Sequence, residues 1–200
     1  MRSRPGEQRP ARPSPAPEPH LPPEQRRRIY IGEVVASATP LQLQTLLGSC
    51  VAVCLRDPAA AIGGMNHILL PGRCYGDGLP SRCGVQAMEL LINAIMKEGG
   101  DRRRLVAKVF GGANVVASLQ SPTVGELNAI FIRDFLATER IPLVAERLGG
   151  THPVQVNFRT DTGRTTVHTV DGSRLPKILR AEDDYGCSFA KAGSGEVTLF

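Results

Sequence analysis

The spacing of apolar residues changes along the chain and predicts an alternation of strands and helices. Short apolar runs bounded by Gly, Pro and Asp predict strands, and residues 41–47 lead into a turn at Gly48. Between the first and last groups of strands, apolar residues recur every three or four positions, as in amphipathic helices. The predicted strands are residues 30–37, 51–55, 62–70, 105–110, 142–147, 154–158 and 165–170.

Two helices are predicted in the middle of the chain. The first ends at Gly99-Gly100 and carries apolar residues at helical spacing, namely Val85, Met88, Leu91, Ile92, Ile95 and Met96. The second opens with Thr123-Val-Gly-Glu126, in which Thr as N-cap and Glu three residues later form a capping box. Its inward face is predicted to carry Leu127, Ile130, Phe131 and Phe135. Strands gathered at both ends around two helices favour a layered α+β domain over a doubly wound sheet.

The first 28 residues differ in composition from the rest. They hold eight of the sixteen prolines, seven arginines and three glutamates, with few large apolar side chains. We therefore predict a disordered Pro/Arg-rich tail over residues 1–28 and a single domain over residues 29–200. The pattern weakens after Asp171, and we expect residues 171–200 to be the least ordered part of that domain.

Charge and cysteine content narrow the classes of function. The net charge of +5 comes mostly from the tail, so the body is close to neutral and nucleic acid is not an expected partner. No apolar run is long enough to span a membrane, and no secretory signal is recognised at the start, so we expect a cytoplasmic protein without membrane insertion. The five cysteines lack the usual zinc-ligand spacing, which predicts free thiols and no metal.

The strongest candidate chemistry is a cysteine and a histidine on neighbouring strands. Cys50 follows Gly48-Ser49 at the start of one predicted strand, and His67 lies near the end of the next. Antiparallel pairing brings a strand start against the neighbouring strand's end, so the side chains can meet as a thiol nucleophile and its base. The backbone N–H groups of Gly48 and Ser49 can serve a substrate oxyanion.

A third group would orient the imidazole ring. The Thr45 hydroxyl can accept a hydrogen bond from a ring N–H, although composition alone favours a β-branched strand former at this position. Asn66 is a competing orienter, but as the immediate neighbour of His67 it points to the opposite face of the strand. Cys and His in apolar strands are also often packed core residues, and Cys54 is read as one.

Several ordered blocks of sequence resemble the chemoreceptor glutamine deamidase family, CheD. The resemblance runs from about residue 29 to residue 170. The blocks are Thr45-Leu-Leu-Gly-Ser-Cys-Val-Ala-Val-Cys-Leu-Arg-Asp-Pro58, Gly63-Gly-Met-Asn-His-Ile-Leu-Leu-Pro71, Lys108-Val-Phe-Gly-Gly-Ala-Asn114, Gly125-Glu-Leu-Asn128, Ala145-Glu-Arg-Leu-Gly-Gly150 and Asp161-Thr-Gly-Arg164.

This resemblance implies a layered β-sandwich with flanking helices, similar to the catalytic domain of cytotoxic necrotizing factor toxins. It also implies a protein-glutamine glutaminase that converts receptor glutamines to glutamates in bacterial chemotaxis. The implied catalytic residues are Cys50, His67 and Thr45, with no cofactor and no metal. The implied partners are chemoreceptor cytoplasmic helices and a CheC-type phosphatase.

Two other functions fit part of the pattern. A cysteine peptidase would use the same pair of residues, although the short separation of Cys50 and His67 argues against the papain-like layout. A non-catalytic adaptor that binds chemoreceptors or a CheC-type phosphatase would keep the fold without needing the thiol. Loss of side-chain deamidation in a Cys50→Ala protein would separate the enzyme from the adaptor.

Overall fold

The computed structural model describes residues 21–70, 79–115, 122–171, 176–178, 180–182 and 184. Its strands form two mixed sheets. The four-stranded sheet A has the order β1 (Arg26–Arg28), β3 (Gln42–Leu47), β8 (Val154–Arg159) and β9 (Thr165–Thr169). The five-stranded sheet B has the order β2 (Val34–Ser37), β5 (Ile62–Ile68), β4 (Val51–Asp57), β6 (Val106–Gly111) and β7 (Leu143–Leu148).

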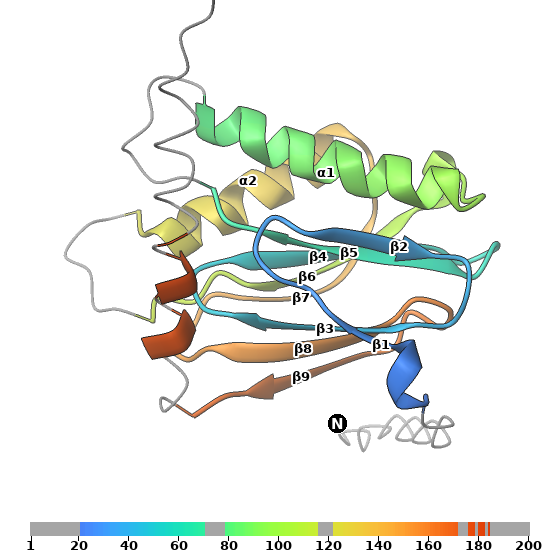
Figure 1. Ribbon diagram of the computed structural model, residues 1–200. Coiled ribbons are helices and arrows are strands. Elements are labelled where there is room, and N and C mark those ends of the chain that lie inside the picture. Colours follow the sequence, from blue (N-terminus) through green and yellow to red (C-terminus); the bar gives the residue numbers. More distant parts are fainter. Residues whose placement is uncertain are drawn as a thin grey trace, which may run out of the picture.

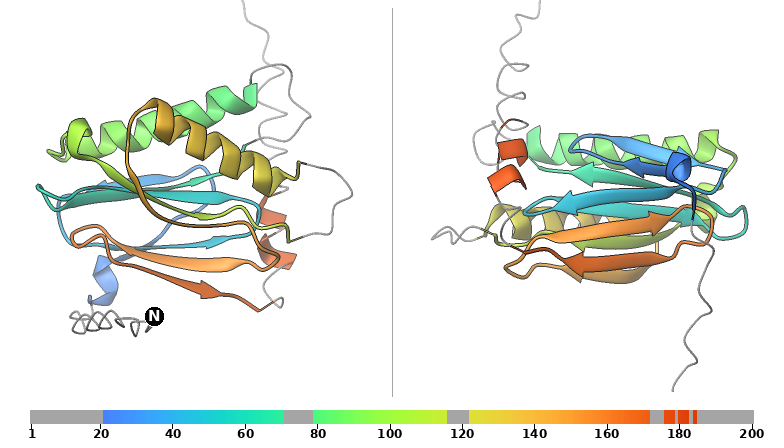
Figure 2. Two further views of the ribbon diagram at one scale, coloured as in Figure 1. Left: turned by 180° about the vertical axis from the view of Figure 1, so that it is seen from behind. Right: turned by 60° about the horizontal axis from the view of Figure 1, so that its bottom comes forward.

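The sheets and helices stack in three layers. Sheet A packs against one face of sheet B, and α1 (Leu79–Lys97) and α2 (Val124–Thr138) cover the other face (Figure 1). Figure 2 shows the same arrangement from behind and from below. Short 3-10 helices at Pro23–Gln25 and Arg102–Arg104 precede β1 and β6. The architecture is the layered α+β sandwich with flanking helices that the sequence predicts.

Alternate residues of strand β4, together with Cys50 before it, belong to two different apolar cores, one on each face of sheet B. Val51, Val53 and Leu55 pack in the core between sheet B and the helices. Cys50, Ala52 and Cys54 pack in the core between the two sheets. Side chains of successive strand residues point to opposite faces, so the alternating pattern places Cys50 toward sheet A rather than toward the helices.

Most predicted strands are confirmed with small shifts of their ends, and two regions differ. The predicted strand 30–37 is a strand only from Val34, because Tyr30–Glu33 form a turn in which Gly32 has φ +83° and Glu33 N–H donates to Tyr30 O. Residues 42–47, expected only as an approach to a turn, form β3. Alternate burial of Leu43, Thr45 and Leu47 against β8 explains that strand.

The boundary of the predicted disordered tail is placed too late in the chain. Arg26–Arg28 form β1, which pairs in parallel with β3, and Leu21 is buried. Composition alone misses this segment because its pairing uses backbone groups, which arginine side chains do not prevent. Residues 1–20 lie outside the described residues.

The capping box of α2 is confirmed, but the predicted inward face of that helix is partly wrong. Leu127 and Ile130 are exposed, whereas Asn128, Ala129, Ile132 and Leu136 are buried with Phe135. The inward face of α2 differs from the predicted one because it includes Asn128. The Asn128 side chain forms hydrogen bonds with backbone groups of two other segments. In α1, Met88, Leu91, Ile92 and Ile95 are buried as predicted, while Val85 and Met96 are exposed.

The end of β4 is fixed by a buried carboxylate. Asp57 has a fully buried side chain that accepts hydrogen bonds from the Arg104 guanidinium and from the backbone N–H groups of Ala59, Ala60 and Asp101. Hydrogen bonding to Arg104, supported by these backbone donors, holds the pKa of Asp57 well below its ordinary value. The carboxylate therefore joins β4 to the segment that leads into β6.

Replacing this carboxylate should destabilise the fold. Hydrogen bonds to a charged group contribute about 1.5–3 kcal/mol, so we expect Asp57→Ala to lower the free energy of unfolding at pH 7 by about 2–3 kcal/mol in urea titrations. Because the folded pKa is depressed, the contribution is complete above about pH 4 and is lost as the pH falls further. Asp134→Ala, on the exposed side of α2, is the control and should change stability little. Equal effects of the two substitutions at pH 7 would contradict this account.

Candidate active site

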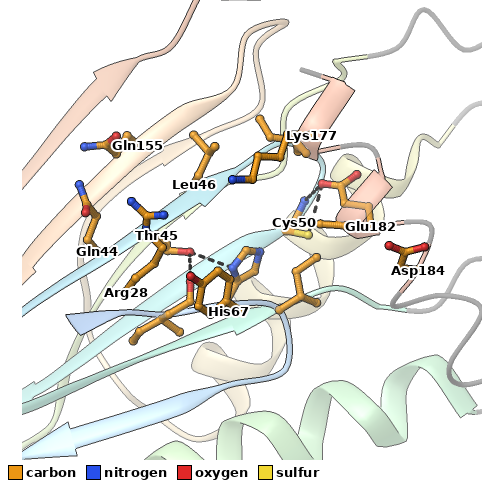
Figure 3. A pocket seen from close by; sticks show the side chains of 15 residues that line it. Arg28, Gln44, Thr45, Leu46, Cys50, His67, Gln155, Lys177, Glu182 and Asp184 are labelled. Atoms are coloured by element: carbon orange, nitrogen blue, oxygen red, sulfur yellow. Dashed lines mark hydrogen bonds between the residues drawn. The ribbon is translucent and has the colours of Figure 1, made fainter. Parts of the chain in front are cut away.

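Three predicted site residues lie at one end of the sandwich and line one cavity. Thr45 comes from β3 of sheet A, Cys50 immediately precedes β4, and His67 lies on β5 of sheet B. Strands β4 and β5 are antiparallel, with His67 opposite Ala52, so Cys50 is a diagonal neighbour of His67 on the same face. Figure 3 shows the three side chains, which reach the cavity from three different segments of the chain.

The hydrogen bonds of Thr45 fix the tautomer of His67. The Thr45 hydroxyl donates to Ile29 O at 2.8 Å, and Thr45 Oγ1 lies 2.8 Å from His67 Nδ1. A hydroxyl has one proton, so Thr45 must accept from His67 Nδ1–H, and Nε2 carries the lone pair. Nε2 is buried and has no hydrogen-bond partner among the described residues. This nitrogen is therefore available as a base.

Burial keeps the imidazole of His67 neutral. The side chain is only 4 % exposed, and this desolvation lowers its pKa from 6.5 to about 4, with the Ile29 carbonyl opposing the shift. At neutral pH the ring thus has the protonation state of a general base rather than that of an imidazolium.

The turn before β4, residues 48–50, is held in place by hydrogen bonds to its three backbone carbonyl groups. Gly48 O accepts from Ala113 N–H at 2.8 Å, Ser49 O from Asn128 Nδ2 at 2.9 Å, and Cys50 O from Gly112 N–H at 2.7 Å. In a trans peptide the carbonyl and the following N–H point in opposite directions. Anchoring the first two carbonyls therefore turns the N–H groups of Ser49 and Cys50 the other way, toward the cavity.

Two glycines allow this turn to form. Gly111 has φ +105°, and a Cβ there would overlap the carbonyl oxygen of Cys50. A Cβ at Gly48 would stand 2.9 Å from Glu182 Oε1, in the space in front of the two N–H groups. Of the predicted oxyanion residues, Ser49 provides an N–H donor, the second donor is Cys50, and Gly48 leaves the space open.

A carboxylate occupies that space. Glu182 Oε1 accepts from Ser49 N–H at 3.0 Å and Cys50 N–H at 3.4 Å, and Oε2 accepts from Ser49 Oγ at 2.7 Å. Cys50 Sγ donates to Oε1 at 3.3 Å (Figure 3). Burial, followed by the negative charge of Glu182 and this hydrogen bond, raises the pKa of the Cys50 thiol well above its ordinary value. In this structure the sulfur is a thiol paired with Glu182, not with His67.

The cavity has a volume of about 680 Å³, large enough for a side chain and part of the backbone that bears it. Arg28 and Tyr30 line it from the N-terminal segment, and Gln44 and Gln155 line it from sheet A. A further part of the wall comes from the helical residues that include Ile178 and Glu182.

The other candidate groups lie elsewhere. Asn66 faces the helices, where it accepts from Val53 N–H and donates to Ala87 O. Cys54 is buried in the core between the sheets, where burial raises its pKa. Among the described residues, no group of three or more His, Cys, Asp or Glu side chains could hold a metal ion.

Sequence reasoning missed two residues of the site. Asn128 gives one local signal in the sequence, since it lies seven positions before Phe135 on the helix side predicted to face inward, where an amide needs polar partners. Glu182 gives none, because it lies 132 positions from Cys50 and in a region without clear periodicity.

Comparisons with known proteins identify the family of this chain. A family model described as CheD chemotactic sensory transduction matches residues 69–169. A protein from Stenotrophomonas maltophilia (strain K279a) is 49 % identical over 159 residues, which cover 79 % of this chain and 80 % of that protein. The chain belongs to the CheD family.

Other CheD relatives are similarly close. A protein from Xanthomonas campestris pv. campestris (strain B100) is 50 % identical over 79 % of this chain and 80 % of its own. One from Thiobacillus denitrificans is 43 % identical over 86 % of this chain and 88 % of its own. All three relatives carry the name "Probable chemoreceptor glutamine deamidase CheD".

A solved structure of a hypothetical protein, YfiH, from Bacillus licheniformis shows a weaker likeness. Its TM-score is 0.39 at 16 % identity, covering 56 % of this chain and 49 % of that one, which is too low to support an inference. In the described part of this CheD protein, no helix has both the length and the apolar character needed to cross a membrane.

The protonation state of His67 can be measured directly. We expect NMR of ¹⁵N-histidine-labelled protein to show a neutral Nδ1–H ring at pH 7 that titrates at about pH 4. Because the folded pKa lies below 6.5, the unfolded chain binds more protons between these values, so this histidine reduces stability as the pH falls from about 6.5 to about 4. Exposed His152 is the internal control. An imidazolium at position 67 near neutral pH would contradict the assignment.

Proposed function

We propose that this protein is a chemoreceptor glutamine deamidase in bacterial chemotaxis, with Cys50 as the nucleophile and a thioester intermediate. The observation that carries the proposal is the geometry around Cys50. Two backbone N–H groups converge on one carboxylate oxygen, and that oxygen lies 3.3 Å from the sulfur. A glutamine carbonyl at this position has the nucleophile beside it and hydrogen-bond donors for the oxyanion.

The first half of the reaction transfers the acyl group to the enzyme. His67 Nε2 removes the thiol proton as Cys50 Sγ attacks the side-chain carboxamide carbon. A C–S bond forms, and the oxyanion is stabilised by the N–H groups of Ser49 and Cys50. The imidazolium then gives its proton to the amide nitrogen, the C–N bond breaks and ammonia leaves.

The second half restores the thiol. Neutral His67 takes a proton from water, whose oxygen attacks the thioester carbon. The C–S bond breaks, and the imidazolium returns the proton to the sulfur, leaving glutamate. Throughout the cycle His67 Nδ1 keeps its proton and donates it to Thr45, so one ring orientation serves both halves.

Asn128 is proposed as a positioning residue for the oxyanion site. Its Nδ2 group donates to Ser49 O, which belongs to the same peptide as Cys50 N–H, and its Oδ1 accepts from Leu70 N–H at 2.8 Å. The side chain thus ties the turn before β4 to the segment after β5. It acts on the reaction through the orientation of a backbone donor.

The proposed substrate is a glutamine on a cytoplasmic helix of a chemoreceptor. Deamidation replaces a neutral amide with a negative charge, which changes the electrostatics of a helix bundle and hence its signalling state. The names of the curated relatives support the substrate class. A CheC-type phosphatase is proposed as a further partner on the family resemblance alone, and the cytoplasm as the location follows from this substrate.

A cysteine substitution tests the function and the nucleophile together. A chemoreceptor cytoplasmic fragment is incubated with wild-type protein or with Cys50→Ala, and its peptides are measured by mass spectrometry. We expect glutamine-to-glutamate conversion by the wild type alone, since removal of the nucleophile abolishes acyl transfer. Cys54→Ala is the matched control, because that thiol is buried away from the cavity. Conversion by neither protein, with the fragment still bound, would favour the adaptor.

The role of Asn128 predicts a kinetic effect. Asn128→Asp keeps an acceptor for Leu70 N–H but loses the donor to Ser49 O. Loss of one oxyanion donor lowers kcat about 10²–10³-fold, so we expect displacement of a donor to lower kcat by roughly 10–100-fold with little change in KM. Steady-state kinetics on the receptor fragment measure both constants. A change confined to KM, or to thermal stability, would show that Asn128 does not position the oxyanion site.

A further inference from the structure

The side chain that occupies the oxyanion site is itself a glutamate, which is the product of the proposed reaction. Its Oε1 lies where the substrate carbonyl oxygen would lie, in contact with Ser49 N–H, Cys50 N–H and Cys50 Sγ. A glutamine side chain has the same shape, with an amide nitrogen in place of one oxygen. Ser49 Oγ, which donates to Oε2 here, can instead accept from that amide nitrogen.

The residues that carry Glu182 fit the cavity by more than this one contact. Residues 176–178, 180–182 and 184 are helical, and Ile178 is buried and lines the cavity. A Cβ at Gly48 would come within 2.8 Å of Ile178 Cγ2, so the absence of a side chain at Gly48 admits both Ile178 and Glu182. The segment therefore presents a glutamate to Cys50 from a helix, as a receptor helix would.

We propose that Glu182 is an intramolecular product analogue, which holds the deamidase in an inhibited state until a receptor helix displaces it. This inference rests on the function proposed above. The contact inhibits in two ways. It fills the oxyanion site, and it engages the Cys50 thiol as a hydrogen-bond donor, so the sulfur is not available to His67.

Inhibition of this kind has a specific kinetic form. A tethered group competes with substrate at an effective concentration set by its linkage, and such concentrations reach the millimolar range. Competition raises the apparent KM and leaves kcat unchanged. Removal of the carboxylate should therefore lower KM for the receptor fragment several-fold without changing kcat.

The most direct test converts the product analogue into a substrate analogue. In full-length Glu182→Gln, Cys50 Sγ attacks the carboxamide carbon of the introduced glutamine, ammonia leaves with a proton from His67, and water hydrolyses the thioester to restore glutamate at position 182. We expect mass spectrometry of purified protein to find glutamate there. The double variant Cys50→Ala/Glu182→Gln should keep glutamine, and Gln86, exposed on α1, serves as the internal control.

The second measurement is steady-state kinetics of Glu182→Ala on the receptor fragment. We expect a several-fold lower KM and an unchanged kcat. Arg180→Ala is the control, because Arg180 is exposed on the same segment and is not part of the cavity wall. A segment with only a structural role would give lower thermal stability and lower kcat instead.

The outcomes separate this inference from the proposed function. In one outcome the wild type converts the receptor fragment, the introduced glutamine persists at position 182, and Glu182→Ala has the wild-type KM. This outcome contradicts the inference that Glu182 is a product analogue and supports the proposed deamidase function. A lower KM without conversion of the introduced glutamine also overturns the product analogue, because the segment then only obstructs the cavity. Conversion of that glutamine without conversion of the receptor fragment supports the inference and contradicts the proposed substrate. If neither the introduced glutamine nor the receptor fragment is converted, both the inference about Glu182 and the proposed function are contradicted.

Discussion

The site depends on how the turn of residues 48–50 is anchored through its carbonyl groups. Each carbonyl is bound by a donor from outside the turn, two from the backbone that follows β6 and one from the Asn128 side chain on α2. Because the peptide plane is rigid, these bonds determine where the N–H groups of Ser49 and Cys50 point. A preorganised pair of donors needs no rearrangement when negative charge develops on a substrate oxygen. In the proposed mechanism, the helix layer thus contributes to the chemistry through the amide of Asn128.

The second requirement of the proposed mechanism is a neutral base, and the sandwich architecture holds His67 in that protonation state. Thr45 reaches His67 from the opposite sheet, so the ring orientation is set by the packing of sheet A on sheet B. Burial between the sheets lowers the histidine pKa, and the hydroxyl directs the remaining proton to Nδ1. A neutral base and a thiol can exchange a proton during attack, whereas an exposed imidazolium could not accept one. The same burial raises the pKa of Cys50, so in the proposed mechanism the thiolate forms only as the reaction proceeds.

The sequence predicts what depends on local pattern and misses what depends on distant contacts. Strand periodicity and the Gly48-Ser49 turn place Cys50 and His67 on neighbouring strands, and a capping box places the start of α2. Apolar periodicity does not select Asn128, because its burial reflects polar partners rather than hydrophobicity, and the inward face that it predicts for α2 is partly wrong. Glu182 cannot be found from local pattern for a different reason, since its partners lie more than 130 positions away along the chain. From the residues alone Thr45 is one candidate orienter, which composition favours as a β-branched strand former, and the family resemblance implies the role of third residue that we propose for it.

The central claim is that an acyl-enzyme forms at Cys50, and trapping it with a second nucleophile tests this most directly. Deamidation of the receptor fragment is run with increasing hydroxylamine, and the products at each glutamine are measured by mass spectrometry. A thioester partitions between water and hydroxylamine, so the account predicts a side-chain hydroxamate at the same positions that otherwise become glutamate, and none with Cys50→Ala. Glutamate alone at every hydroxylamine concentration would show that water attacks the amide directly, and would contradict the account.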